Sequence, residues 1–192
     1  MWEALLSMNR LRRTIVLVGL MGAGKTSVGK RLAELLDAPF YDSDVEIEAA
    51  AAGMSVPEIF ERYGEPEFRR LERCVLQRLL NEPPIILATG GGAFVNPETR
   101  TTILEQGALS IWLSVDVDVL WARVSNKPGR PLLETENPKE TLQKLFDARS
   151  PLYELADMTV HSNADDSQET VAEMVIAALT SADELREENK NG

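Results

Sequence analysis

One short pattern near the start of the chain constrains its fold more than any other feature. Residues 19–26 have the spacing G-x-x-x-x-G-K-[ST]. The β-branched apolar run at 14–18 before it predicts a buried strand, and the helically spaced apolar residues at 27–36 after it predict a helix. A strand, a glycine loop and a helix in this order form a phosphate-binding unit. The pattern therefore predicts an α/β chain that binds a nucleoside triphosphate.

The residue types of this loop suit contact with phosphate. Glycines let backbone N–H groups curl around phosphate oxygens, and the N-terminus of the helix adds its positive dipole. We expect Lys25 to reach the β- and γ-phosphates and the Thr26 hydroxyl to ligate Mg²⁺. The other residues expected to bind ATP here are Gly22, Ala23, Gly24 and Ser27.

The composition is that of a small globular enzyme. The chain has 192 residues, 44% of them hydrophobic and 27% charged, which predicts a single ordinary domain. The net charge of −11 argues against a nucleic-acid partner that needs a basic face. The single cysteine, Cys74, rules out an intramolecular disulfide, so we expect a cytoplasmic protein with a packed structural thiol. No run approaches the ~20 apolar residues of a membrane helix, so we expect no membrane partner.

Strand-like and helix-like segments alternate along the rest of the chain, which is typical of a parallel sheet covered by helices. Further strands are predicted at 39–41, 85–89, 109–113 and 158–160. Helices are predicted at 45–52, 55–63, 66–81, from 97 onward, and at 115–124, 138–148 and 168–179. The polar residues 181–192 are expected to fray into solvent as a C-terminal tail.

Three of the predicted strands are followed by segments suited to ligand binding. In such sheets, ligands bind beyond the carboxyl ends of the strands. The glycine loop follows the first strand, Asp42 and Asp44 follow the second, and Gly90–Gly92 follow the third. One carboxylate would hold the Mg²⁺ shell and the other would orient or deprotonate an attacking hydroxyl, although both also fit a solvated helix cap. A triple glycine exposes N–H groups and admits a substrate closely, or simply makes a tight turn.

The arginines fall into two groups. Most lie on predicted helices beside glutamates, where a solvated face explains them. Arg69, Arg130 and Arg149 lie instead near the expected ligand site, and a planar guanidinium suits bidentate contact with a carboxylate or phosphate. The lone histidine, His161, is expected at the surface.

These motifs together resemble the shikimate kinase family. The likeness runs in order from about residue 14 to residue 179. It rests on Gly19–Thr26, Asp42-Ser43-Asp44, Phe68-Arg69, Gly90-Gly91-Gly92, Arg130-Pro131-Leu132-Leu133 and Arg149-Ser150-Pro151-Leu152-Tyr153. The resemblance implies the nucleoside monophosphate kinase fold, a three-layer sandwich in which a five-stranded parallel sheet has helices on both faces. Within a P-loop NTPase domain at 14–180, it implies a substrate-binding subdomain at about 44–72 and a lid at about 125–137, after an N-terminal extension at 1–13.

The resemblance also implies a role for each matching residue. Lys25 and Arg130 would neutralise charge on the transferred phosphoryl group, Thr26 and Asp42 would hold Mg²⁺, and Asp44 would orient the attacking hydroxyl. Arg123 would stack on adenine, and Arg130 would also contact ATP. The residues implied to bind shikimate are Asp44, Arg69, Gly90, Gly91, Gly92 and Arg149, with the two arginines on its carboxylate.

The implied function is ATP- and Mg²⁺-dependent transfer of the γ-phosphate to the 3-hydroxyl of shikimate, a step of chorismate and aromatic amino-acid biosynthesis, by a cytoplasmic monomer. The segment 162–166 departs from the family, which often places an arginine or similar group near adenine there. Two alternatives remain open. A gluconate-type kinase would share the loop without needing Arg69 and Arg149 around a triple glycine. A non-catalytic nucleotide-binding regulator would not need the full set of charged residues.

Overall fold

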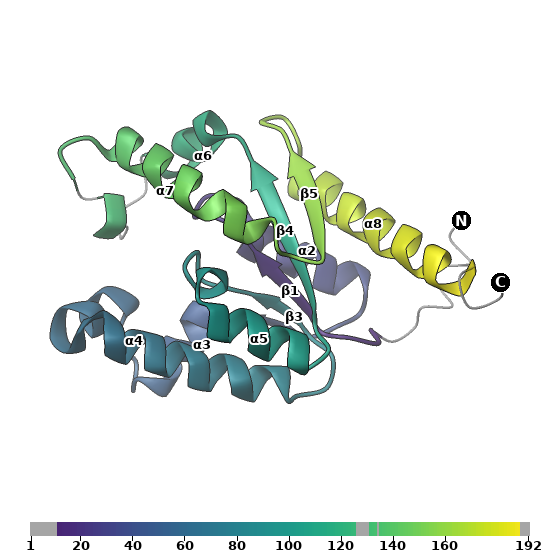
Figure 1. Ribbon diagram of the computed structural model, residues 1–192, viewed down its shortest axis with the longest axis horizontal. Helices are drawn as coiled ribbons and strands as arrows, with labels where there is room; N and C mark the ends of the chain where they lie inside the picture. The colour runs from purple at the N-terminus through teal and green to yellow at the C-terminus, as the bar shows by residue number, and fades with distance from the viewer. Residues whose placement is uncertain (1–10, 126–130, 134, 189–192) are drawn as a thin grey trace.

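The computed structural model describes residues 11–125, 131–133 and 135–188. Five parallel strands form one sheet in the order β2-β3-β1-β4-β5 (Figure 1). They are β1 (Ile15–Val18), β2 (Phe40–Asp42), β3 (Ile86–Ala88), β4 (Leu109–Val115) and β5 (Met158–Ser162). The central strand β1 pairs with both β3 and β4, so that Leu17 lies opposite Ala88 on one side and Ile111 on the other. The predicted five-stranded parallel sheet is confirmed.

Helices cover both faces of this sheet. The helices are α2 (Lys25–Leu35), α3 (Ser43–Ala50), α4 (Val56–Leu80), α5 (Pro97–Glu105), α6 (Val117–Val124), α7 (Pro138–Tyr153) and α8 (Gln168–Glu188), with short 3₁₀ turns at Ala93–Val95 and Pro131–Leu133. Helices α2 and α8 pack together on one face, whereas α4, α5 and α7 lie on the other (Figure 1). None of the helices in the described part of the chain is long and apolar enough to cross a bilayer.

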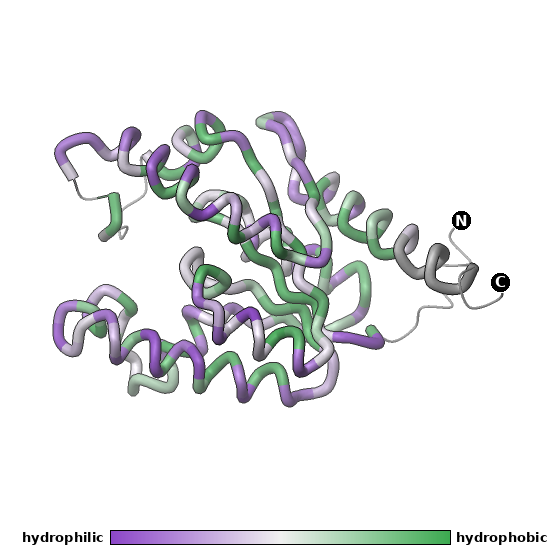
Figure 2. Tube along the Cα trace, viewed as in Figure 1, coloured by the Kyte–Doolittle hydropathy of each residue, from purple (hydrophilic) through white to green (hydrophobic). Residues whose placement is uncertain are grey.

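The core lies between the sheet and its two helical layers. The side chains of Val16, Leu17, Ile86, Leu87 and Ile111 are completely buried. Strands covered on both faces have no side exposed to solvent, so their sequences are continuous apolar runs and do not alternate between apolar and polar residues. Figure 2 shows this pattern as apolar central strands beside helices in which polar and apolar residues alternate. The rigid sheet fixes the positions of the loops at its carboxyl edge.

The long helix α4 shows how local sequence sets the helices. The Ser55 side chain accepts a hydrogen bond from the Glu58 N–H, and the Glu58 carboxylate accepts one from the Ser55 N–H, which completes the predicted capping box. Gly64 interrupts the helix with a φ of 79°, a left-handed conformation that glycine adopts without a steric penalty. The two consecutive helices predicted at 55–63 and 66–81 are therefore confirmed, joined by a kink.

Three expectations differ from the structure. Helix α7 continues past the predicted end at residue 148 to Tyr153 and includes Pro151 near its C-terminus. Helix α8 continues to Glu188, because the residues expected to fray include the good helix formers alanine, glutamate, leucine and arginine. Cys74 is exposed rather than packed, because it lies on the outward face of α4.

Candidate active site

The glycine loop after β1 has the geometry of a phosphate cradle. Gly22 and Gly24 have φ angles of 86° and 89°, and Gly24 is the N-cap of α2. Residues with a side chain rarely adopt these angles, so glycine is required at both positions. The turn directs backbone N–H groups at the start of α2 into one concave site, where the helix dipole adds positive potential. The Lys25 ammonium group lies over the loop and donates to the carbonyls of Gly19 and Leu20 at 2.8 and 3.0 Å.

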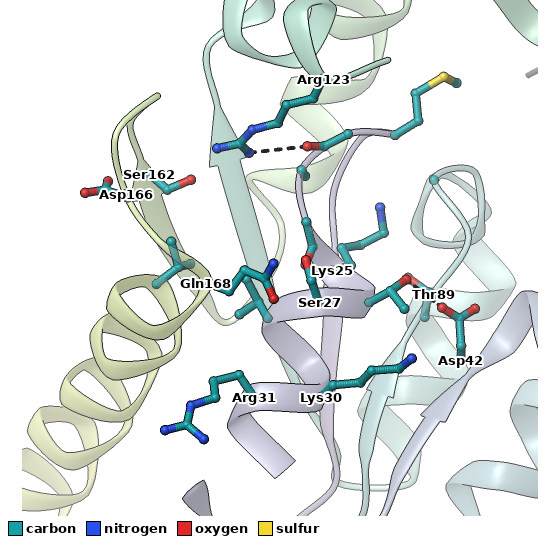
Figure 3. A pocket seen from close by; sticks show the side chains of 18 of the residues that line it. Lys25, Ser27, Lys30, Arg31, Asp42, Thr89, Arg123, Ser162, Asp166 and Gln168 are labelled. Carbon is teal, nitrogen blue, oxygen red and sulfur yellow. Dashed lines mark hydrogen bonds between the residues drawn. The ribbon is translucent and has the colours of Figure 1, made fainter. Parts of the chain in front are cut away.

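A cavity of about 1060 Å³ opens above this loop. Its walls come from the loop and α2, from Asp42 and Asp44, from the turn at 89–91, from Arg123 on α6, and from the segment 162–171 that joins β5 to α8. Figure 3 shows Lys25 and Ser27 between Asp42 on one side and Gln168 on the other, with Arg123 above them. Segments distant in sequence thus converge at the carboxyl edge of the sheet, as expected for a sheet of this kind.

Thr26 and Asp42 form a pair of oxygen donors beside the cradle. The Thr26 hydroxyl donates to Asp42 Oδ2 at 2.7 Å, which brings together the two predicted metal-ligating side chains. Asp42 Oδ1 accepts from the Asp44 N–H at 3.1 Å, so the carboxylate is fixed as the N-cap of α3. Hard oxygen donors of this kind suit Mg²⁺, which is commonly held by one or two protein groups together with phosphates and water. Among the described residues, no cluster of three or more His, Cys, Asp or Glu side chains offers a separate metal site.

At Gly90 and Gly92 the turn after β3 needs glycine for space rather than for backbone conformation. A Cβ atom on Gly90 would lie 2.7 Å from Asp44 Oδ1, and one on Gly92 would lie 2.6 Å from Arg69 Nη2. At Gly91 a Cβ atom would lie 3.4 Å from the Met21 backbone nitrogen, which is an ordinary van der Waals contact. The turn therefore touches Asp44, the phosphate loop and Arg69 with its three successive residues. A plain tight turn, the alternative left open by the sequence, would not require these approaches.

Arg69 is held in place by carboxylates of its own helix. Its Nη1 lies 2.8 Å from Glu72 Oε2 and its Nη2 lies 3.2 Å from Glu65 Oε1, while its guanidinium lies 5.2 Å from the Phe68 ring centroid. The Glu72 side chain is only 1% exposed. Burial raises the pKa of its carboxyl above the ordinary value, against the opposing effect of Arg69. Burial lowers the pKa of Arg69, but Glu72 and Glu65 outweigh it, so that the pKa of the guanidinium is raised.

Arg149 approaches the same turn from the opposite side. It lies on α7, in the part of the helix that extends past its predicted end, and its Nη1 donates to the Gly91 carbonyl at 3.2 Å. The hydroxyl of Tyr153, one helical turn further on, also donates to this carbonyl. Arg69, Gly92 and Arg149 do not line the large cavity itself. The two arginines lie against the Gly90–Gly92 turn, whose first two residues do line it.

Arg123 contacts both the phosphate loop and segment 162–166, the segment whose sequence differs from the family pattern. Its Nη1 donates to the Gly22 carbonyl at 3.3 Å, and its Nη2 donates to the Asn163 carbonyl at 3.4 Å. The wall beyond Arg123 is made by side chains of the acidic segment and the start of α8, including Asp166 and Gln168 (Figure 3). Segment 162–166 therefore borders the nucleotide side of the cavity, although it lacks the arginine or similar group that the family often has there.

Most of the predicted site residues meet in one region. The exception is Arg130, which lies outside the described residues together with the lid residues 126–129 and 134. His161 is exposed, as expected, with its ring edge-on to Trp112 at 6.4 Å. Sequence reasoning missed the roles of Glu72 and Tyr153. A signal was present in both cases, because each follows a candidate arginine by three or four residues and so lies on the same helical face.

The fold and the site define a P-loop kinase with an acceptor site for an anionic small molecule beside the phosphate loop. The family model described as shikimate kinase matches residues 21–180. A shikimate kinase of Bartonella henselae is 52% identical over 167 residues, which cover 87% of this chain and 78% of that protein. A solved structure of shikimate kinase from Acinetobacter baumannii in complex with shikimate has a TM-score of 0.85 and 37% identity, and the match covers 93% of this chain and 98% of that one. This chain belongs to the shikimate kinase family.

The gluconate-type alternative is represented by a more distant structure. A gluconokinase from Sinorhizobium meliloti has a TM-score of 0.60 and 20% identity, with 94% of this chain and 98% of that chain covered. At this identity the likeness shows a shared fold alone. The family match therefore decides between the two kinds of kinase.

Proposed function

We propose that this protein transfers the γ-phosphate of ATP to the 3-hydroxyl of shikimate, giving shikimate 3-phosphate and ADP. The observation that carries the proposal is the turn at Gly90–Gly92. It has Arg69 on one side and Arg149 on the other, and it touches both Asp44 and the phosphate loop. This arrangement gives an anionic acceptor two guanidinium groups and a nearby carboxylate within reach of bound triphosphate. The reaction supplies chorismate and aromatic amino-acid biosynthesis.

On the acceptor side, Arg69 and Arg149 bind the shikimate carboxylate. A planar guanidinium offers two parallel N–H donors to a carboxylate, which fixes orientation as well as position. Asp44 binds the ring hydroxyls, and the absence of side chains on Gly90, Gly91 and Gly92 leaves room for the ring against the turn. The ion pair between Arg69 and Glu72 supports this role because it holds the guanidinium in one place before substrate arrives.

On the nucleotide side, the loop from Gly22 to Ser27 binds the phosphates through its backbone, and Arg123 stacks on adenine. Thr26 and Asp42 hold Mg²⁺, a role that the 2.7 Å contact between their oxygens supports. When bound with ATP, this ion neutralises charge on the β- and γ-phosphate oxygens.

The transfer step depends on positioning and charge neutralisation, because the transition state of phosphoryl transfer is loose. The 3-hydroxyl of shikimate attacks the γ-phosphorus in line, its oxygen forms the new P–O bond, and the bond to the β-phosphate oxygen breaks to release ADP. Asp44 orients the hydroxyl and accepts its proton. Lys25 and Arg130 stabilise the equatorial oxygens of the phosphoryl group. A cytoplasmic location and a monomeric state remain predictions from the sequence.

A coupled assay of ADP release tests the proposal. Purified protein with ATP and Mg²⁺ is measured without acceptor, with shikimate and with gluconate. We expect turnover only with shikimate, and a collapse of that turnover in Arg149→Ala and Arg69→Ala. Equal turnover with gluconate, or turnover that does not depend on an acceptor, would contradict the proposal.

A further inference from the structure

The last residue of α7 is a buried tyrosine that the roles described so far do not use. The Tyr153 side chain is 1% exposed, and its ring lies 5.8 Å from the Trp112 ring with the two planes tilted by 31°. A buried phenol needs a hydrogen-bond partner for its hydroxyl. Here that partner is the Gly91 carbonyl, in the middle of the triple glycine. The phenol therefore connects the packed β4–α7 region directly to the acceptor site.

The Gly91 carbonyl oxygen receives two donors from α7. The Arg149 guanidinium donates at 3.2 Å and the Tyr153 hydroxyl donates beside it. The two residues are four apart in one helix, so their side chains lie on the same face. A carbonyl oxygen has two lone pairs, and these two bonds match its accepting capacity. The carbonyl is therefore fixed toward α7.

Fixing this carbonyl also fixes the direction of the next N–H group. The Gly91–Gly92 peptide bond is trans, so its C=O and N–H lie in one plane and point in opposite directions. The Gly92 N–H therefore points away from α7. Gly92 itself lies against Arg69, and within the described residues no acceptor binds its N–H. This N–H is thus left as a donor that a bound acceptor can use.

The tyrosine can keep this bond at any pH at which the enzyme would work. Burial raises the pKa of its hydroxyl to about 12, and the neighbouring Arg149 only partly opposes the rise. The phenol remains protonated and so remains a donor. Arg149 donates to the same carbonyl from Nη1, so the two α7 side chains act on it together.

We propose that Tyr153 is a positioning residue for shikimate binding, whose hydroxyl holds the Gly91–Gly92 peptide in the orientation that leaves the Gly92 N–H available to the acceptor. The inference rests on the proposed function. It assigns no contact between the hydroxyl and the substrate and no part in proton transfer.

The test is Tyr153→Phe, which removes one oxygen and keeps the ring that packs on Trp112. We expect the dissociation constant and the KM for shikimate to rise about fivefold, which corresponds to about 1 kcal/mol. The KM for ATP is expected to change less than twofold, and the pH profile of kcat should keep its shape. Shikimate binding is measured by titration calorimetry as well as by turnover, so the test does not depend on activity.

Ser150→Ala is the matched control. The Ser150 hydroxyl also donates to a backbone carbonyl from α7, but this carbonyl belongs to Phe146 in the same helix. Its loss should leave shikimate binding unchanged. If Tyr153→Phe lowered the unfolding temperature while both KM values stayed the same, or raised both KM values equally, the positioning role would be wrong. If the unaltered protein did not bind shikimate, the proposed function itself would fail, which is a distinct result.

Discussion

The two halves of the site are built in different ways. The nucleotide half consists largely of eight consecutive residues whose backbone forms the cradle, and Gly24 and Lys25 are placed by the turn from β1 into α2. The acceptor half consists of side chains from α3, α4 and α7 that meet at the Gly90–Gly92 turn. Backbone binding needs only a local conformation. Side-chain binding from separate helices needs partners that hold the side chains and the turn in place. Glu72 pairs with Arg69, and Tyr153 donates to the Gly91 carbonyl.

This difference predicts that the two halves can be damaged separately. A change in the cradle should impair phosphoryl transfer and leave shikimate binding intact. A change around the glycine turn should weaken shikimate binding and leave ATP binding intact.

The largest effect is expected from Lys25→Ala. Removal of one charge aimed at the transferred group costs about 10²–10³ in turnover. We expect that loss in kcat, with the dissociation constant for shikimate unchanged in calorimetry. Lys144→Ala, which removes an exposed ammonium of α7 paired with Glu140, is the control and should behave as the unaltered protein. A parallel loss of shikimate affinity in Lys25→Ala would show that the halves are not separable.

A smaller effect is expected from adding a single methyl group to the turn. In Gly92→Ala the new Cβ would lie 2.6 Å from Arg69 Nη2, so the guanidinium must move from its position. We expect the KM for shikimate to rise about tenfold, equivalent to about 1.4 kcal/mol, with little change in the KM for ATP. In the companion variant Gly90→Ala the methyl group meets Asp44 instead, so kcat should fall more than the KM for shikimate rises. If Gly92→Ala and Gly90→Ala changed kcat and the KM for shikimate in the same way, the separate roles given to Arg69 and Asp44 would be contradicted.

Substitution of Glu72, the buried partner of Arg69, should weaken shikimate binding modestly and should change how the stability of the protein depends on pH. We expect Glu72→Gln to raise the KM for shikimate a few-fold, whereas Glu65→Gln, which alters an exposed partner, should have almost no effect.

Since burial raises the folded-state pKa of Glu72, the folded protein binds this proton more tightly than the unfolded chain. The stability of the unaltered protein relative to Glu72→Gln should thus be greatest below pH about 4.5 and should decline as pH rises through the folded-state pKa.

Denaturant unfolding of Glu72→Gln and of the unaltered protein at several pH values checks this sign. A difference in stability that grew in favour of the unaltered protein with rising pH would mean that the ion pair outweighs burial.

The smallest effect is expected at the junction of α2 and α8. Arg31 donates from Nη2 to Glu169 Oε1 at 2.6 Å and from Nε to Glu169 Oε2, and it also pairs with Glu34. These groups are partly exposed, and exposed ion pairs contribute little because water screens them. Glu169→Gln should change the KM for ATP less than twofold and the KM for shikimate not at all. A large change in shikimate binding in Glu169→Gln would show that a change near the nucleotide half also affects the acceptor half, and would contradict the separation of the two halves.

The difference between the local cradle and the acceptor half, which is assembled from separate helices, also explains how much of the site can be predicted from the sequence. The cradle, the sheet and most helices follow from local patterns, since the glycine spacing, apolar runs and capping residues act over a few neighbours. The role of Tyr153 does not follow in this way, because it depends on which carbonyl the fold brings to its hydroxyl. The pairing of Glu72 with Arg69 follows from their spacing in α4, whereas the burial of Glu72 depends on packing. The end of α7 was mispredicted because Pro151 suggests a stop, whereas the helix accommodates it and carries Arg149 and Tyr153 to the turn.

Identification of the product tests the central claim most directly. The purified protein is incubated with ATP, Mg²⁺ and shikimate, and the products are followed by phosphorus NMR and mass spectrometry. The account predicts equal amounts of ADP and of a monophosphate ester on the 3-hydroxyl of shikimate, and slower formation of both in Asp44→Asn. ADP accompanied by inorganic phosphate, or a phosphate ester on another hydroxyl, would contradict it.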